Sequence, residues 1–406
     1  MHIAISDNLA RDHFLAMKIL LRKIRSACYH AREWDKRRVA RRAVRDRFRA
    51  CRNWLQRLTT QRPEVLVGAN FVPFGGTRQH MHSLLRYSSL NLAIVPDDAV
   101  LEQVEPGFLA AEFNDEFYLW PPVGVKTVHS HVFPWFIEWC DFQKRQRGVR
   151  WVHTHHNWYY PEFGKGILEP WQTQFNEGFL FALRNADVCL SVSKWQQRFL
   201  RDQFGLDSNY LPNGVDVKVC DQANASRWVA KTGLRDFVLY LGRNDPVKNP
   251  VDFVLLAQSV PALQFVMIGQ GLSVDVLLNE WQITTPGNLT VLSGVSHDEA
   301  QDAIAACAVL VMTSKREGLP TLALEAMAQS KPVVVPTEDG CMEAIENGEF
   351  GFIYEQGNIE HLVEVTLEAL QDRLRCRRSR QHVLNEYDWP VIMRKLDRVY
   401  AGANGP

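Results

Sequence analysis

Two glutamates eight positions apart, Glu317 and Glu325, lie in the segment TSKREGLPTLALEAMA at 313–328. Carboxylates accept hydrogen bonds from the paired hydroxyls of sugars and ribose. Gly318 lets the backbone approach a ligand closely, and the free N–H groups at the start of a helix favour phosphate. The segment therefore predicts a ligand that carries both hydroxyl and phosphate groups.

The alternative interpretation is that both glutamates are ordinary surface charges. For Glu325 the neighbours argue against it, because TLALEAMA is almost entirely apolar around this carboxylate. A charge buried among apolar side chains requires a specific partner. We therefore treat both glutamates as candidate site residues.

Two cations follow an apolar run in the segment LYLGRNDPVKNP at 239–250, namely Arg243 and Lys248. A planar guanidinium and a mobile ammonium suit a diphosphate leaving group, whose growing negative charge must be stabilised without proton transfer. Two surface cations in a loop are the alternative. The segment predicts a diphosphate site at Arg243 and Lys248.

A pair of glycines, Gly75 and Gly76, lies in FVPFGGTRQHMH at 71–82. Such a pair lets backbone amides reach a phosphate before the helix that we expect from Thr77, and a plain tight turn is the alternative. The sequence has no G-x-x-x-x-G-K-[ST] pattern, so a nucleotide-hydrolysing P-loop is not supported.

Five histidines gather in HSH at 129–131 and HTHHN at 153–157: His129, His131, His153, His155 and His156. One interpretation is the metal site of a hydrolase that uses zinc or manganese, since imidazole is a common ligand. Such a site also needs acidic ligands, which are not evident nearby. Buried structural histidines are the other interpretation.

The elements that must position these residues follow a regular alternation from Glu64 onward. Short apolar runs bounded by Gly, Pro or Asn alternate with helical patterns, which is typical of βαβ units. We expect strands at Val65–Ala69, Asn91–Val95, Phe117–Trp120, Arg150–His153, Val188–Val192, Phe237–Leu241, Gln264–Ile268, Leu289–Leu292, Val309–Thr313 and Pro332–Val335. We expect helices near 76–88, 170–185, 194–204, 249–259, 272–280, 297–306 and 320–329.

These elements predict an α/β chain with two tandem Rossmann-like domains, at 63–212 and 213–385, followed by a closing helix and tail at 386–406. Ligands of such folds bind outside the carboxyl ends of the strands. Pro320 suits the first position of a helix, which leaves Glu317 in the loop before it and Glu325 in its second turn. Both carboxylates can then face one crevice.

The first 62 residues differ in character from the rest of the chain. Between Arg22 and Arg62 there are 15 Lys or Arg against three acids, an excess of 12 positive charges, although the whole chain has a formal charge of zero. Val44, Phe48, Cys51, Leu55 and Leu58 recur at helical spacing, so we expect a basic amphipathic helical extension. The extension has three interpretations: it is a solvated helical hairpin packed on an acidic domain, it binds an anionic membrane face with the help of Trp34 and Trp54, or it binds nucleic acid, which is the least favoured.

No run of 18 apolar residues is present, and charged residues interrupt the first twenty positions where a signal peptide would be apolar. The eight cysteines are scattered without a C-x-x-C pair, which is typical of reduced thiols. We expect a cytoplasmic protein, peripheral on the inner membrane face if the extension binds lipid.

The segment EGLPTLALEAMA resembles the E-x7-E motif of retaining glycosyltransferases of the family 4 class, which have the GT-B fold. Further segments resemble the same family: the G-R-x-x-x-x-K pattern ending at Lys248, Thr154 with His156 and Asn157, YLPNGVD at 210–216, and EYDWPVIMRKLDRVY at 386–400. The resemblance covers about 65–400 and leaves the first 62 residues outside it.

The resemblance implies a hexosyltransferase that moves sugar from a nucleotide-diphosphate donor to an acceptor hydroxyl in polysaccharide or glycolipid assembly, with no cofactor and no metal. Glu317 would contact the donor sugar, Glu325 the ribose, and Arg243 and Lys248 the diphosphate. His156 would face the sugar from the other domain, with His155 as the reserve.

Gly75, Gly76, Gly318 and Leu319 would complete the donor site. The acceptor would be a sugar or a lipid-linked sugar. A histidine-metal hydrolase and a non-catalytic sugar-nucleotide-binding protein remain the alternatives to a transferase.

Overall fold

The structure is a computed structural model that describes residues 36, 38–68, 76–163, 166–372 and 374–406. It divides into two compact units. The smaller unit joins the N-terminal segment up to Gln61 to the inserted segment Asp97–Pro121, and the larger unit contains the rest of the chain.

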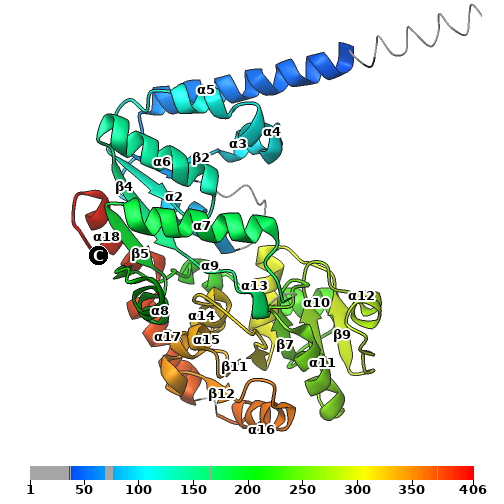
Figure 1. Cartoon of the computed structure of the whole chain (residues 1–406). Helices are drawn as coiled ribbons and strands as arrows, with labels where there is room; N and C mark the ends of the chain where they lie inside the picture. The colour runs from blue at the N-terminus through cyan, green and yellow to red at the C-terminus, as the bar shows by residue number, and fades with distance from the viewer. Residues whose placement is uncertain (1–35, 37, 69–75, 164–165, 373) are drawn as a thin grey trace, which may run out of the picture. The chain divides into compact units, whose positions relative to one another are not determined.

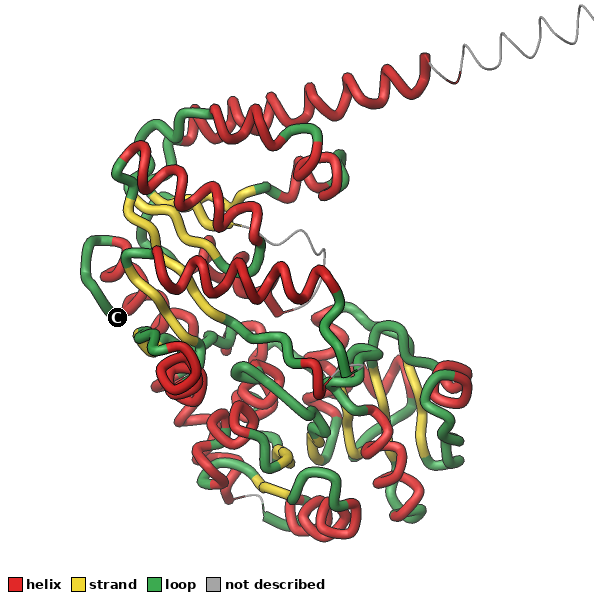
Figure 2. The backbone as a smooth tube through the Cα atoms, in the orientation of Figure 1, coloured by secondary structure: helices red, strands yellow, loops and turns green. Residues whose placement is uncertain are grey.

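The larger unit contains a first sheet of six parallel strands in the order β2-β1-β3-β4-β5-β6 (Figures 1 and 2). The strands are β1 (Val65–Gly68), β2 (Leu92–Val95), β3 (Thr127–Ser130), β4 (Arg150–His155), β5 (Val188–Ser191) and β6 (Asn209–Tyr210). The helices that pack with this sheet are α2 (Gly76–Tyr87), α6 (Pro134–Arg147), α7 (Pro170–Asn185), α8 (Lys194–Phe204) and α18 (Trp389–Tyr400).

The C-terminal helix α18 is part of the first fold although the chain reaches it last. Its apolar side chains share one core with the strands β1 and β4 and with helix α2. Helices α6 and α7 contact each other; α6 also contacts the strands β3 and β4, and α7 contacts β4. Burial on both faces explains why β1 and β2 are continuous apolar runs rather than alternating ones, whereas β3 and β4 also contain buried histidines.

A second sheet of six parallel strands has the order β12-β11-β10-β7-β8-β9. Its strands are β7 (Val238–Leu241), β8 (Phe265–Ile268), β9 (Leu289–Leu292), β10 (Val309–Val311), β11 (Val333–Pro336) and β12 (Phe352–Tyr354). Its helices are α9 (Val217–Asp221), α10 (Ala225–Thr232), α11 (Pro250–Ser259), α12 (Val274–Asn279), α13 (His297–Ala306), α14 (Thr321–Ala328), α15 (Asp339–Ala344), α16 (Ile359–Ala369) and α17 (Leu374–Glu386).

Each face of the second sheet has its own apolar core. Helices α11 and α16 cover one face, and helices α9, α10, α13, α14 and α17 supply the core on the other. The strand order is that of a dinucleotide-binding fold, in which the order reverses between the first and fourth strands, here β7 and β10. In the first sheet the reversal lies between β1 and β3. Ligand sites are expected at the carboxyl ends of these four strands.

The smaller unit is helical. Residues 38–61 form one helix, and the inserted segment adds α3 (Asp98–Leu101), α4 (Pro106–Ala111) and α5 (Asn114–Leu119). Trp54 is 1% exposed and stacks on Phe117 with ring centroids 5.7 Å apart. Ion pairs join the arginines of the long helix to acids of the insert: Arg47 to Glu105, Arg52 to Glu116 and Arg57 to Asp97.

The expected elements agree with the structure at most positions, with one clear error. Phe117–Trp120, which we expected to be a strand, falls mostly in helix α5, because its aromatic side chains pack against the long helix of the smaller unit. The strand that occupies its place in the first sheet is β3. Pro320 is the N-cap of α14, one position before the first helical residue that we expected it to be.

Among the described residues, no helix combines the length and the apolar character needed to cross a bilayer. The seven cysteines in the described part of the chain are buried thiols.

Candidate functional site

Glu317 and Lys248 meet at the carboxyl ends of β10 and β7. The Lys248 Nζ donates to Glu317 Oε1 at 2.5 Å, and the two side chains are 27% and 12% exposed. Two residues that the sequence analysis selected from separate segments therefore form one ion pair at the expected edge of the sheet. The pair is largely shielded from water, which strengthens its electrostatic attraction.

The loops that carry this pair are fixed to each other by backbone contacts. The Thr313 hydroxyl donates to the carbonyl oxygens of Lys248 at 3.1 Å and Asn249 at 2.7 Å. The Lys315 amide donates to the carbonyl of Val247 at 2.7 Å. These bonds hold the position of Lys248 relative to the loop that leads to Glu317.

Arg243 extends from the same β7 loop and is mostly exposed. Its guanidinium donates to Asp245 Oδ2, with distances of 2.8 and 2.7 Å, and Asp245 also accepts from the amide of Val247. Burial raises the pKa of Tyr159, and the positive charge of Arg243 acts in the opposite direction. Arg243 therefore lies near enough to Tyr159, in the segment that follows β4, for the two groups to interact electrostatically.

His156 follows β4 and lies against Gly318 through its backbone. A Cβ added to Gly318 would lie 2.2 Å from the His156 carbonyl oxygen, so only glycine permits this approach. Gln196 donates to the same carbonyl at 2.8 Å, and the Trp195 indole donates to the Gly318 carbonyl at 2.8 Å. The structure thereby brings the backbone of His156 next to the loop of Glu317.

Glu325 has a different set of partners from Glu317. Gln301 Nε2 donates to Glu325 Oε2 at 2.7 Å, and Gln301 Oε1 accepts from Gln329 at 2.7 Å. Burial raises the pKa of Glu325, and the nearby His297 and the bond from Gln301 act against this rise. The partner that the apolar surroundings of Glu325 required is therefore Gln301, which sequence reasoning missed.

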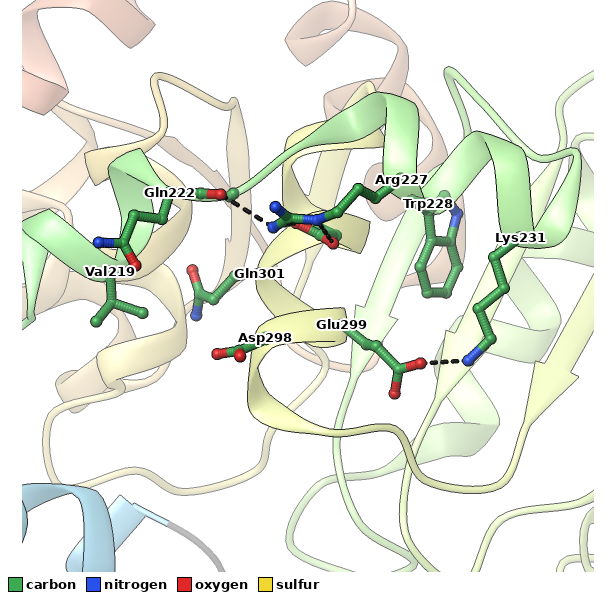
Figure 3. A pocket seen from close by; sticks show the side chains of 10 residues that line it. Val219, Gln222, Arg227, Trp228, Lys231, Asp298, Glu299 and Gln301 are labelled. Atoms are coloured by element: carbon green, nitrogen blue, oxygen red, sulfur yellow. Dashed lines mark hydrogen bonds and ion pairs between the residues drawn. The ribbon is translucent and has the colours of Figure 1, made fainter.

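A cavity of about 450 Å³ lies on the Gln301 side of the second fold (Figure 3). Helices α9, α10 and α13 line it, and Arg227 donates two bonds to Asp302, at 2.7 and 2.8 Å, across it. Lys231 pairs with Glu299 at its edge. The cavity shares Gln301 with Glu325, but its lining includes neither Glu317 nor Lys248.

The remaining predicted donor residues are only partly described. Gly75 lies outside the described residues, and Gly76 is the first residue of α2. The side chain of Leu319 is buried in the core of the second fold, and its carbonyl accepts a long bond of 3.5 Å from Asn213. Leu319 can thus offer its backbone rather than its side chain to a ligand.

The histidines form a buried cluster at the carboxyl ends of β3 and β4. His129 bonds to the Tyr400 hydroxyl at 2.6 Å and to Thr154 at 2.8 Å, and His153 bonds to Ser130 at 2.9 Å. These bonds support the structural interpretation of His129 and His153.

His131 and His155 have fewer polar partners. A hydrogen bond of 2.8 Å joins His131 Nδ1 to His156 Nε2. His155, the reserve candidate, packs its ring against Phe179 and Trp158, and both of its ring nitrogens are buried without a hydrogen-bond partner among the described residues. His155 therefore points into an aromatic environment, which leaves His156 as the candidate.

Burial lowers the pKa values throughout this cluster. The pKa falls to about 4 for His156 and to about 3 for His129 and His155. For His131 and His153 it lies well below the usual range, and neighbouring histidines add to the effect of burial. At neutral pH these imidazoles are uncharged, so His156 can accept or donate a hydrogen bond but carries no positive charge.

Arg316, which immediately precedes Glu317, is a site residue that the sequence prediction missed. Its guanidinium lies 3.9 Å from the Trp195 ring centroid and 4.9 Å from that of Tyr160. It also pairs with Glu338 at 3.5 Å and Asp339 at 3.3 Å. Arg316 thus connects the loop of Glu317 in the second fold to aromatic side chains of the first fold.

Two tandem α/β folds, each built on a parallel sheet, are the architecture of GT-B proteins. Two family models match this chain: Glycosyl transferases group 1 over residues 223–387 and Glycosyltransferase Family 4 over residues 118–219. The chain belongs to the group 1 glycosyltransferases of the family 4 type.

Relatives of known sequence agree with this assignment. An uncharacterised glycosyltransferase of Methanocaldococcus jannaschii is 25% identical over 225 residues, which are 55% of this chain and 61% of the relative. A GDP-mannose-dependent monoacylated alpha-(1-6)-phosphatidylinositol monomannoside mannosyltransferase of Corynebacterium glutamicum is 25% identical over 52% of this chain and 61% of its own length. The similarity thus spans about three fifths of these relatives.

Solved structures show the same fold. The sucrose-phosphate synthase of Thermosynechococcus elongatus has a TM-score of 0.67 at 18% identity, covering 83% of this chain and 98% of that protein. HepE of Anabaena, in complex with UDP and glucose, has a TM-score of 0.66 at 18% identity, covering 84% of this chain and 99% of that protein.

Proposed function

We propose that this protein is a retaining, metal-independent hexosyltransferase that moves a sugar from a nucleotide-diphosphate donor to an acceptor hydroxyl. The observation that carries the proposal is the Lys248–Glu317 ion pair, next to the close approach of Gly318 and His156. A cation for the diphosphate, a carboxylate for sugar hydroxyls and a neutral imidazole are what such a transfer needs at one place.

In the proposed reaction the acceptor hydroxyl attacks the anomeric carbon on the face that the diphosphate leaves, and its proton goes to the departing phosphate oxygen. Lys248 and Arg243 stabilise the charge that grows on that oxygen as the bond breaks. Glu317 orients the sugar by accepting from its hydroxyls, and His156 bonds to it from the opposite side. Glu325, held by Gln301, accepts from the ribose hydroxyls.

Named relatives and neighbours support a nucleotide-sugar donor and a lipid-linked acceptor. A similar mannosyltransferase is GDP-mannose-dependent and acts on a phosphatidylinositol monomannoside, and a structural neighbour was solved with UDP-glucose. We therefore place the proposed reaction in glycolipid or polysaccharide assembly.

The first experiment identifies the donor by the thermal stabilisation that UDP-, GDP- and ADP-sugars give the protein, because a ligand of the native state raises its melting temperature. Donor hydrolysis and transfer are then measured for Glu317→Ala and Lys248→Ala. Removing one preorganised electrostatic contact typically lowers kcat by about 10²–10³-fold.

The matched control is Glu349→Ala, which breaks an exposed pair with Arg378 at 2.7 Å in the same fold. It should leave kcat within about twofold, since exposed pairs contribute little. Wild-type rates in both Glu317→Ala and Lys248→Ala would refute the proposed function.

We further propose that the long helix of the smaller unit binds anionic lipid through one face. Arg38, Arg41, Arg45 and Arg49 are exposed and follow each other at spacings of three or four, which places them on one side of the helix. Trp54 is buried within the unit and cannot enter the membrane interface as we expected, so the attraction is electrostatic. Each basic group near an anionic surface contributes about 1 kcal/mol, and salt screens it.

Co-sedimentation with phosphatidylserine-containing vesicles across a salt series tests this surface. Changing Arg41, Arg45 and Arg49 to Gln should abolish sedimentation at low salt. The control removes the same charge from exposed positions of the second fold: Arg235, Arg377 and Arg378. Equal binding of both variants, or equal binding to neutral vesicles, would contradict the proposal.

A further inference from the structure

Three histidines from three different elements of the first fold meet at the edge of the site. His80 comes from the second turn of α2, His131 follows β3, and His156 follows β4. One ring nitrogen of each lies within 4.8 Å of those of the other two. The sequence prediction overlooked His80. This residue joins the cluster because it lies near the start of α2, the helix that follows β1.

The ring nitrogens of this trio have few competing partners. The side chain of Asn213 interacts with the His80 ring. Within the described part of the chain, however, no hydrogen bond of good geometry reaches either nitrogen of His80 or His131 Nε2. His131 is 1% exposed, so its free nitrogen is shielded from water. A buried polar atom without a partner is costly, and a bound group that accepts the lone pair of one His80 nitrogen would remove that cost for this atom.

The ring nitrogens lie near enough to one another for side-chain rotations to form a three-histidine metal centre. At a metal–nitrogen distance of about 2.0–2.1 Å, tetrahedral ligands lie about 3.3 Å apart. His131 Nδ1 and His156 Nε2 are 2.8 Å apart, and small side-chain rotations would open this separation. The proton between them moves to the other nitrogen of its own ring, so no net proton loss is required.

We propose that His80, His131 and His156 form a binding site for one zinc ion that inhibits the transferase. Three imidazoles without a carboxylate favour zinc over magnesium or calcium, which prefer oxygen ligands. Zinc would hold the ring nitrogen of His156 and so remove this side chain from the donor sugar. The inhibitory consequence rests on the proposed function, whereas zinc binding itself does not.

Zinc binding is measured on the full-length chain after EDTA treatment and dialysis, by competition with a chromogenic zinc chelator. One zinc per chain is expected, and Co²⁺ in its place should give the visible absorption of a tetrahedral centre. His80→Gln should weaken zinc binding by at least about 100-fold, since loss of an outer-sphere partner alone costs 10–100-fold.

The matched control is His82→Gln on the same helix, which should leave zinc affinity unchanged. Circular dichroism checks the fold of each variant, and anomalous scattering at the zinc edge from wild-type crystals locates the ion without any variant. No stoichiometric zinc binding, or equal affinity in wild type and His80→Gln, would overturn the site.

Activity separates the two proposals. With the site present, zinc inhibits transfer by the wild type, EDTA restores it, and metal-free His80→Gln transfers sugar but resists zinc. Stoichiometric zinc binding with transfer that is insensitive to zinc would refute the inhibitory role, and insensitive transfer without zinc binding would refute the site; in both cases the function stands. Stoichiometric zinc binding without any transfer activity would refute the function and leave the site standing.

Discussion

The buried histidines of the first fold should make the metal-free protein unfold in mild acid. Four of them, His129, His131, His153 and His155, are at most 1% exposed, and burial holds their pKa values at about 3 or well below the usual range. In the unfolded chain each would titrate near its ordinary pKa of about 6.5. The folded state therefore binds fewer protons than the unfolded state between these values.

The sign of the effect follows from this difference in proton binding. Stability is fully present above about pH 6.5, where the imidazoles are neutral in both states, and it is lost as pH falls toward the folded pKa values. Each histidine contributes about 1.4 kcal/mol per pH unit, so four contribute about 5 kcal/mol per unit. Because a folded domain has about 5–15 kcal/mol of stability, we expect the first fold to unfold near pH 5.

Urea denaturation between pH 5 and 8 in EDTA, followed by tryptophan fluorescence, measures the slope of the unfolding free energy against pH. His155→Leu removes one titrating group whose nitrogens have no partner among the described residues. It should lower the slope by about one quarter and raise stability at pH 5 by about 2 kcal/mol. A slope that His155→Leu does not change would show that other groups drive acid unfolding.

Two further changes test the packing around the site and in the smaller unit. Arg316→Ala should lower the free energy of unfolding by about 3 kcal/mol, because the contact with Trp195 is lost and buried Glu338 is left without its cation. Arg316→Lys should lower it by about half as much. Urea midpoints measure both variants, and equal effects would contradict a stacking role. Trp54→Ala should lower the stability of the smaller unit by about 3–5 kcal/mol and increase proteolysis of residues 38–61. Arg41→Ala, at an exposed position of the same helix, is the control and should have little effect.

The sequence predicted most strands of the second fold and its helices α11 to α14, but not α9, α10 or α15 to α17. Strands β7 to β11 agree within one or two residues with the expected segments, because a parallel strand buried on both faces needs a continuous apolar run. The convergence of Lys248 and Glu317 also followed from sequence, since the carboxyl ends of parallel strands share one edge. Strand β12 was missed because three residues carry too little periodicity.

The first fold was less predictable because its polar groups are satisfied only by tertiary contacts. Strand β3 contains His129 and Ser130, whose burial depends on Tyr400 and His153, far away in the chain. The apolar run at Phe117 gave no means of distinguishing a buried strand from a helix, since its partner Trp54 lies in another segment. Arg316 carried no sequence signal beyond its position beside Glu317.

The two glutamates that share one motif have different chemical surroundings, and this difference indicates how the site could respond to a donor. Glu317 is paired with Lys248, a group that can exchange partners, whereas Glu325 is held by the neutral amide of Gln301. We expect a diphosphate to compete for Lys248 and thereby release the Glu317 carboxylate toward the sugar hydroxyls. Glu325 needs no such exchange, because an amide donor leaves its second oxygen able to accept from ribose. Lys248→Ala should therefore weaken diphosphate binding, while Gln301→Leu should weaken nucleoside binding and leave the response to free diphosphate unchanged.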